Sequence, residues 1–343
     1  MVKQSMTLSL ALVAGMSLGS LPAVASAHAM PVVVGAFPAP PKGVGPGKLM
    51  VLPLRHEHHP YVVKFGRAGT MSGNSFYVAS TKNRAYVPSI AGYTDVMDIA
   101  TGKRIDRFHT LKGGRVAALS KNHKTLFVLS AKRLAAYSAK DGAKRYEIAF
   151  GGNAMALNRD GSRLFVGGNM DKTIAEINPM TGLIIRQIPI GHTGDMVFAN
   201  GYIVSADMKS GVMTAYNPLT EKTYTMATPE TDPHFSYHKI PQANAGFMQL
   251  AVSPDQKYVY AAGFSGHILR FSTSKPAYLG EVAVDANRSG PNKLSGLTVL
   301  DHGKRAISTV ENRHESVEVD LSNGRIIKRL KDVASNRWIH ART

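Results

Sequence analysis

Short runs of apolar, β-branched and aromatic residues recur along the chain about every 40 residues. Before most runs stands a polar turn such as "NRDGSR" or "SPDQK", and before most of these turns lies another apolar stretch. Two β-prone runs joined by a short turn are typical of a β-hairpin. The runs are "AYVPS", "LFVLS", "LFVGG", "YIVSA", "YVYAA" and "AISTV", with third residues Val87, Val128, Val166, Val204, Tyr260 and Ser308.

In most repeats an alternating segment follows the run, for example "TIAEINPMTG" or "VMTAYNPLTE". A polar turn ends this segment, and a further β-prone stretch such as "LIIRQIPIG" comes next. Each repeat therefore predicts four short antiparallel strands, and four strands at this period make one blade of a β-propeller. The repeats show no sustained 3.6-residue periodicity, which excludes a helical solenoid. We expect an all-β propeller.

Six repeats are visible, and the two ends of the chain can supply a seventh blade. "KLMVLPL" and "PYVVKFG" have the pattern of outer strands, and "SNRWIH" that of an innermost strand. Joining the ends in one blade would close the ring and remove the free sheet edges. We expect residues near Trp338 to pair with residues near Leu49 to Phe65, and Trp338 to be buried. Seven blades are favoured, with six as the alternative.

The repeats resemble the YVTN-type propeller repeat and, more widely, the quinoprotein amine dehydrogenase heavy-chain-like propellers. The residues that carry the resemblance include "SPDQKYVYAAG" from Ser253, "NRDGSRLFVGG" from Asn158 and "VMDIATGKRI" from Val96. The likeness extends over about residues 75 to 333. It implies the fold, whereas such repeats encode blade structure and do not specify a function.

Two intervals between blades are longer than the others. The spacings of the aligned third residues are 41, 38, 38, 56 and 48. The extra residues are "TDPHFSYHKIPQANAG" from Thr231 and "DANRSGPNK" from Asp285, each between the last strand of one blade and the first of the next. In such a propeller, the inter-blade loops share a face with the loops between second and third strands. We therefore expect both inserts on that face. Long loops on a rigid scaffold tend to carry binding sites, although surface insertions are also tolerated without a function.

Most histidines outside the N-terminal part map to this same face. Histidine is the commonest metal ligand and the usual acid or base near neutral pH. The chain contains no H-E-x-x-H, G-x-S-x-G or P-loop motif, and it has no cysteine for a nucleophile. The ligand-binding candidates on this face are His192, His234, Tyr237, His238, His267, Glu311, Arg313 and His314.

Three groups of histidines are candidates for a divalent metal such as copper, which favours nitrogen donors. His234 and His238 are four residues apart, but the flanking prolines prevent a helix from fixing their geometry. His56 and His58 alternate in "RHEHHPY" and would share one side of a strand, although a solvated edge strand explains them as well. His28 would offer an α-amine and an imidazole if it began the mature chain.

The first 27 residues have the features of a secretory signal peptide. Lys3 is followed by an apolar stretch, and Ala25-Ser26-Ala27 fits the rule for signal-peptidase cleavage. We therefore expect a periplasmic or secreted protein, and no transmembrane segment in the mature chain because no second long apolar run follows. The expected organisation is a signal peptide over 1–27, a loosely packed Pro/Gly-rich lead segment over 28–47 and one propeller domain over 48–343.

The chain is strongly basic, with a formal net charge of +18 over 343 residues. Residues 1–27 hold one lysine and no acidic residue, so the mature chain carries +17. This charge favours an anionic protein partner or a small anionic ligand, although it is also an ordinary adaptation of exported proteins. Nucleic acid is disfavoured by export and because no block of five or more basic residues occurs. We expect a monomer or one member of a hetero-complex.

Two classes of function are consistent with these features. The first is a binding or accessory propeller that holds a ligand or partner on the face with the inter-blade loops. The second is an enzyme or enzyme subunit on the same face, with either a lactonase- or lyase-like activity or, as the resemblance implies, the non-catalytic propeller subunit of a quinoprotein dehydrogenase. The chain shows no compact catalytic constellation, which favours the binding module.

We predict that the exported protein begins at His28. Signal peptidase should cut after Ala27, because this residue completes the small-residue motif that follows the apolar stretch. The intact mass of protein recovered from the export compartment tests this, and a mass that includes residues 1–27 would contradict it.

Overall fold

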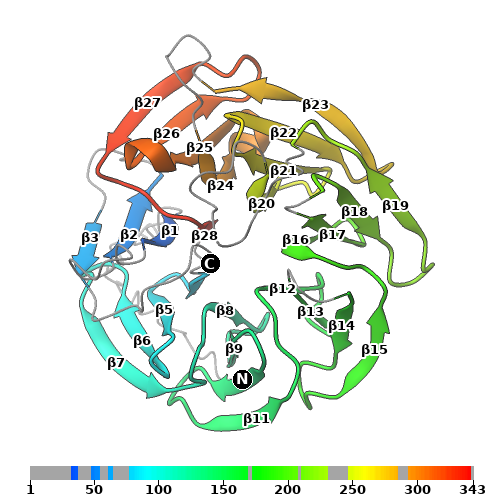
Figure 1. Ribbon diagram of the computed structural model, residues 1–343. Coiled ribbons are helices and arrows are strands. Elements are labelled where there is room, and N and C mark those ends of the chain that lie inside the picture. The colour runs from blue at the N-terminus through cyan, green and yellow to red at the C-terminus, as the bar shows by residue number, and fades with distance from the viewer. Residues whose placement is uncertain are drawn as a thin grey trace, which may run out of the picture.

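Seven four-stranded antiparallel sheets form a ring in the computed structural model, like the blades of a propeller (Figure 1). The prediction of an all-β propeller with seven blades is confirmed. The described residues contain no helix that is long and apolar enough to span a membrane. The structure describes residues 32–37, 48–54, 61–64, 77–168, 172–207, 210–230, 246–284 and 293–340.

Six of the blades are each built from four consecutive strands, with the first strand at the centre of the ring and the fourth at its rim. The strands are β4 (Ala79–Ser80), β5 (Arg84–Ser89), β6 (Tyr93–Asp98) and β7 (Arg104–His109); β8 (Val116–Leu119), β9 (Thr125–Leu129), β10 (Leu134–Ser138) and β11 (Lys144–Ile148); β12 (Ala154–Leu157), β13 (Leu164–Gly167), β14 (Ile174–Ile177) and β15 (Ile184–Ile188); β16 (Thr193–Ala199), β17 (Tyr202–Asp207), β18 (Met213–Tyr216) and β19 (Thr223–Met226); β20 (Phe247–Val252), β21 (Tyr258–Gly263), β22 (His267–Ser272) and β23 (Ala277–Ala283); β24 (Leu294–Leu300), β25 (Arg305–Val310), β26 (Glu315–Asp320) and β27 (Ile326–Lys331). Two short 3₁₀ turns, η2 (Asp301–Gly303) and η3 (Glu311–Arg313), precede β25 and β26.

The seventh blade joins the two ends of the chain, as expected. Its strand order is β28 (Trp338–His340), β1 (Val32–Phe37), β2 (Lys48–Pro53) and β3 (Tyr61–Lys64), with β28 innermost. In Figure 1 the blue N-terminal strands therefore stand beside the red C-terminal blade.

The partner of β28 differs from the prediction. Trp338 pairs with Gly35 of β1, and not with residues 49 to 65. Strand β1 lies inside the segment that we expected to be loosely packed, so this expectation is wrong for Val32–Phe37. Proline and glycine dominate the composition around it, but "VVVGAF" is itself an apolar β-prone run, and Val33 and Val34 are fully buried.

Trp338 is buried, with 1% of its surface exposed, as its place in an inner strand predicts. The indole lies against Gly35 and Gly296, where an added Cβ would come within 3 Å of the ring. Its Nε1 donates to Thr309 Oγ1 at 2.9 Å. Its backbone N–H and C=O both bond the side-chain amide of Gln249, at 2.8 and 2.7 Å. The closing strand is thus fixed by packing and by hydrogen bonds to two other blades.

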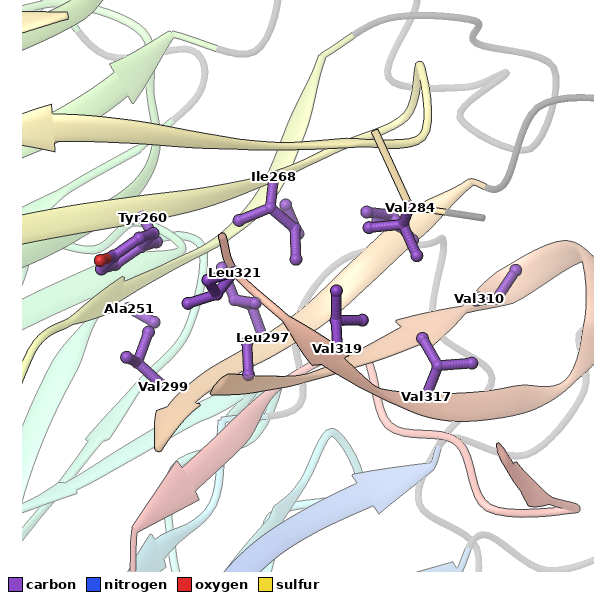
Figure 2. Packing of buried hydrophobic residues seen from close by; sticks show 13 residues of the cluster. Ala251, Tyr260, Ile268, Val284, Leu297, Val299, Val310, Val317, Val319 and Leu321 are labelled. Carbon is purple, nitrogen blue, oxygen red and sulfur yellow. The ribbon is translucent and has the colours of Figure 1, made fainter. Parts of the chain in front are cut away.

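The aligned apolar runs are the second strands of their blades, β5, β9, β13, β17, β21 and β25. Their third residues are at most 4% exposed. They are buried because each sheet packs face to face with the next blade around the ring. Figure 2 shows one such layer, in which Tyr260 and Ile268 of one blade face Leu297, Val299 and Val319 of the neighbouring blade.

Carboxylates on the third strands are paired with arginines. Asp95 of β6 accepts from Arg107 at 2.7 Å, and Glu176 of β14 contacts Arg186 at 2.6 Å and Arg163 at 3.0 Å. Glu318 of β26 pairs in the same way with Arg305. Since these carboxylates are almost fully buried, the arginines supply the partners that a buried charge requires.

We predict that deleting residues 335–343 lowers the melting temperature by about 10 °C or more, because it removes β28 and the buried Trp338. The control is deletion of residues 341–343, which removes no residue of β28 and should leave the melt almost unchanged. Equal melting temperatures for the two truncated proteins would contradict a role for β28 in closing the ring.

Candidate functional site

The seven inner strands surround a central channel with a cavity of about 340 Å³. Its lining combines apolar side chains, such as Met155, Leu157 and Phe198, with polar ones, such as Ser80 and Gln249. At one end, polar residues stand at or just before the start of the inner strands. We call this end the channel mouth, and its residues are Tyr77, Arg115, Thr193, Asp195, Arg337 and, from an adjoining turn, Glu311.

The mouth lies on the face that carries the inter-blade loops. Each inner strand follows such a loop, so the residues at its start are on that face. The loops between second and third strands lie on the same face because neighbouring strands are antiparallel. The sequence-based candidates His192, His267, Glu311, Arg313 and His314 are all in such loops or at a strand end beside them.

A hydrogen bond between Tyr77 and Asp195 joins blades that are not neighbours. The Tyr77 hydroxyl donates to Asp195 Oδ2 at 2.5 Å, and the backbone N–H of Leu250 donates to the same oxygen at 2.7 Å. Tyr77 precedes β4, whereas Asp195 lies in β16, and at least two blades separate them in either direction around the ring. This contact therefore crosses the channel just inside the mouth.

Arg337 is the cation nearest to this contact. Its guanidinium lies over the Tyr77 ring, 4.8 Å from the ring centroid, and the residue is only 1% exposed. Burial raises the pKa of Asp195, and the charge of Arg337 opposes that rise. Burial likewise raises the pKa of the Tyr77 hydroxyl, again opposed by Arg337. The guanidinium thus stabilises the charged form of a carboxyl group that has no access to water.

The mouth contains polar atoms that no described residue satisfies. Arg337 Nη1 donates to the carbonyl of Asn336 at 3.0 Å. By contrast, Arg337 Nε, Arg115 Nε and Thr193 Oγ1 are buried and have no hydrogen-bond partner within the part of the chain that the structure describes. Leaving a buried donor unpaired costs about 1–3 kcal/mol, so native proteins rarely do this without a bound ligand or water.

Two of the sequence-based candidates, Glu311 and His314, lie near this mouth. The Glu311 backbone N–H donates to the carbonyl of Lys293 at 2.8 Å, which places η3 beside the start of β24. Burial raises the pKa of Glu311, and Ser295, Arg337, Lys293 and His314 act in the opposite direction. Glu311 and His314 therefore lie within electrostatic reach of the mouth. His192 is exposed in the loop before β16.

A second polar cluster closes the base of the longer insert. Glu230, the residue before the insert, is fully buried, and its carboxylate accepts from the backbone N–H of Gly246, the last residue of the insert, at 2.9 Å. The Ser265 hydroxyl donates to the same carboxylate, and its oxygen lies 2.8 Å from His267 Nδ1. His267 Nε2 is 3.9 Å from Glu281 Oε1. We call Glu230, Ser265, His267 and Glu281 the Glu230 cluster.

The Glu230 cluster resembles a catalytic array only in its residue types. Because Ser265 donates its proton to Glu230, its oxygen accepts from His267, and the imidazole does not act as a base toward it. At Gly263 an added Cβ would lie 2.1 Å from Glu230 Oε1, so the carboxylate is held against a backbone without a side chain. The cluster fixes the two ends of the insert to each other.

The remaining sequence-based candidates lie outside the described residues. These are His234, Tyr237 and His238 of the insert, and the metal candidates His28, His56 and His58. Among the residues that are described, no group of three or more histidine, cysteine or acidic side chains could hold a metal ion. The metal hypothesis therefore stays a prediction for the histidines outside this part.

Sequence reasoning missed Tyr77, Arg115, Asp195, Arg337 and Glu230. The alignment used the second strand of each blade, whereas four of these residues stand near the start of a first strand or of β28. An alignment of the first strands would have placed a polar residue before or within "VAAL", "MVFA" and "WIH".

The fold and the mouth together define a seven-bladed β-propeller with a polar channel opening. No known protein-family model matches the chain, and neither does any curated protein sequence.

We predict that Glu230 makes stability depend on pH. Burial raises the pKa of its carboxyl, with hydrogen bonds from Ser265 and Gly246 opposing the rise. Because the folded-state pKa is higher than the unfolded one, the protonated carboxyl group makes its full contribution to stability at pH values below the ordinary glutamate pKa of 4.5. This contribution is lost as the pH rises through the folded-state pKa. The unfolding free energy of the wild type, relative to that of Glu230→Gln, should therefore fall as pH rises above 4.5.

Denaturant melts of both proteins across this pH range measure the difference, and the other buried carboxyl groups cancel because both proteins contain them. Glu221→Gln, at an exposed glutamate, is the matched control and should run parallel to the wild type. A difference between wild type and Glu230→Gln that stays constant or grows with pH would contradict the raised pKa.

Proposed function

We propose that this chain is an exported binding or accessory propeller that holds a small anionic ligand, or an anionic group of a partner, in the channel mouth. The observation that carries the proposal is Arg337, a buried guanidinium whose Nε has no partner among the described residues and which lies over the ring of Tyr77, a residue of the channel lining. A carboxylate or another oxyanion would satisfy this donor and would add the charge-assisted hydrogen bonds that guanidinium groups favour.

Other groups at the mouth support the same chemistry. Arg115 Nε and Thr193 Oγ1 are further buried polar atoms without a hydrogen-bond partner in the described part of the chain, and they belong to residues at the starts of two other inner strands, β8 and β16. The carboxyl groups of Asp195 and Glu311 have raised pKa values because they are buried, which weakens their repulsion toward an anion. The basic composition of the chain would draw such a ligand from solution.

Export and an accessory role rest on the sequence. The N-terminal signal supports a periplasmic or secreted protein, and the likeness to YVTN-type and amine dehydrogenase heavy-chain-like propellers supports the propeller scaffold on which such a role would be built. The inserts on the face of the mouth supply additional surface for such contacts.

Binding of small carboxylates to Arg115 variants tests the proposal. Arg115→Gln should weaken binding of a mono- or dicarboxylate about tenfold, because one charge-assisted hydrogen bond is worth about 1.5–3 kcal/mol. Arg133→Gln is the matched control, since this arginine lies on the same face but is half exposed and paired with Glu147. Titration calorimetry on the two variants gives the comparison.

Equal affinities for Arg115→Gln and Arg133→Gln would contradict a ligand at the mouth. Native mass spectrometry with metal analysis, on protein purified from its own source, would identify the ligand directly. A bound metal and no anion in that measurement would favour the histidine sites over the mouth.

A further inference from the structure

A second charged pocket lies on the opposite face of the ring. This face carries the loops between first and second strands and the turns between third and fourth strands. The pocket has a volume of about 460 Å³ and lies between the blade β4–β7 and the blade β8–β11. Arg84, Lys124, Lys140 and Arg145 line it, together with His123, and no acidic residue is part of the lining.

These four cations differ from the arginines elsewhere in the blades. Asp95, Glu176, Glu315 and Glu318 each pair with at least one arginine at the surface of their blade. Within the described residues, no carboxylate lies within ion-pair distance of the four pocket cations. Two carboxylates in nearby turns act on these cations from a greater distance, and neither is part of the lining. All four side chains are exposed, so water and salt screen their repulsion, but together they give the opening of the pocket a positive potential that attracts anions.

The two nearest carboxylates are engaged in their own turns. Asp98 accepts from the backbone N–H and the hydroxyl of Thr101, both at 2.7 Å. Asp141 accepts from the backbone N–H of Ala143 at 3.1 Å. Their charges lie near Arg84 and Lys140, but each carboxylate is oriented toward its turn and not into the pocket.

Parts of the pocket are already held in place. The Arg145 guanidinium donates to Thr125 Oγ1 at 2.7 Å and to the carbonyl of Lys124 at 3.0 Å, which fixes its plane. The Tyr86 hydroxyl donates to the carbonyl of Ala139 at 3.0 Å and so joins the two blades at the wall of the pocket. A fixed cation loses less conformational entropy when it binds an anion than a mobile one does.

We propose that this pocket binds a phosphate group. A phosphate monoester carries a charge of about −1.5 to −2 at neutral pH and offers three acceptor oxygens, which suits several cations around one opening better than a single carboxylate does. Two planar guanidinium groups and two ammonium groups combine bidentate contacts with point charges. The volume suits a small ligand. The phosphate could belong to a soluble molecule or to a lipid headgroup, and the two sources share this chemistry.

Titration calorimetry with inorganic phosphate and with glycerol 3-phosphate, on the full protein at low and physiological salt, tests the proposal. Lys124→Gln/Lys140→Gln should weaken binding about tenfold or more, since it removes two charge-assisted contacts. The matched control is Lys222→Gln/Lys304→Gln, which removes the same charge from exposed positions on the same face in other blades. The control should bind as the wild type does.

Vesicle sedimentation separates the two sources of phosphate. If neither soluble compound binds, but vesicles containing phosphatidic acid do, and only Lys124→Gln/Lys140→Gln loses that binding, the phosphate is that of a lipid. Binding of a soluble monoester with the same variant dependence assigns a soluble ligand.

Three outcomes would overturn the proposal. One is an equal loss of affinity in the two double variants, which would show attraction by net charge alone. Another is equally tight binding of acetate or of a polyglutamate peptide, which would remove the preference for phosphate. The third is the absence of binding to any soluble phosphate compound and to the vesicles. A melting temperature within a few degrees of wild type for both variants shows that the fold is intact.

Discussion

The antiparallel pairing of β28 with β1 is the contact on which the ring and its site depend. Val34 pairs with Ile339, so two segments about 300 residues apart in the sequence must meet before the last blade is complete. Closing so long a loop costs entropy, which the buried Trp338 and its bonds to Gln249 and Thr309 offset. Arg337 directly precedes β28, so the same closure brings the central cation of the mouth into place.

The channel mouth keeps charges in a place where they oppose folding. Asp195 and Glu311 are carboxyl groups that burial drives toward the neutral form, and Arg337 is a cation with an unpaired donor among the described residues. Apolar side chains at these positions would avoid the cost of burying charged groups. Groups that weaken stability without serving the fold are characteristic of binding sites, and the proposed anion would restore the missing contacts.

The repeating part of the fold could be predicted from the sequence because each second strand is a short apolar run at a regular spacing. Strand β1 could not, since the proline and glycine around "VVVGAF" suggested a loose segment, and only its pairing with β28 gives it a place in a sheet. At the site, Glu311 and His314 were found through the face of the ring on which their loop lies. Asp195 and Tyr77 were not, because each is a single polar residue whose meaning depends on a partner more than 100 positions away.

The Glu230 cluster also bears on how this propeller could change over time. One buried carboxylate accepts a hydrogen bond from Gly246, the last residue of the insert, and so ties the end of the insert to the residue that precedes it. A peptide grafted between Glu230 and Gly246 would keep both groups of this contact. The insert is therefore a position at which this scaffold could acquire a new specificity, in evolution or by engineering, while the contact at its base is retained.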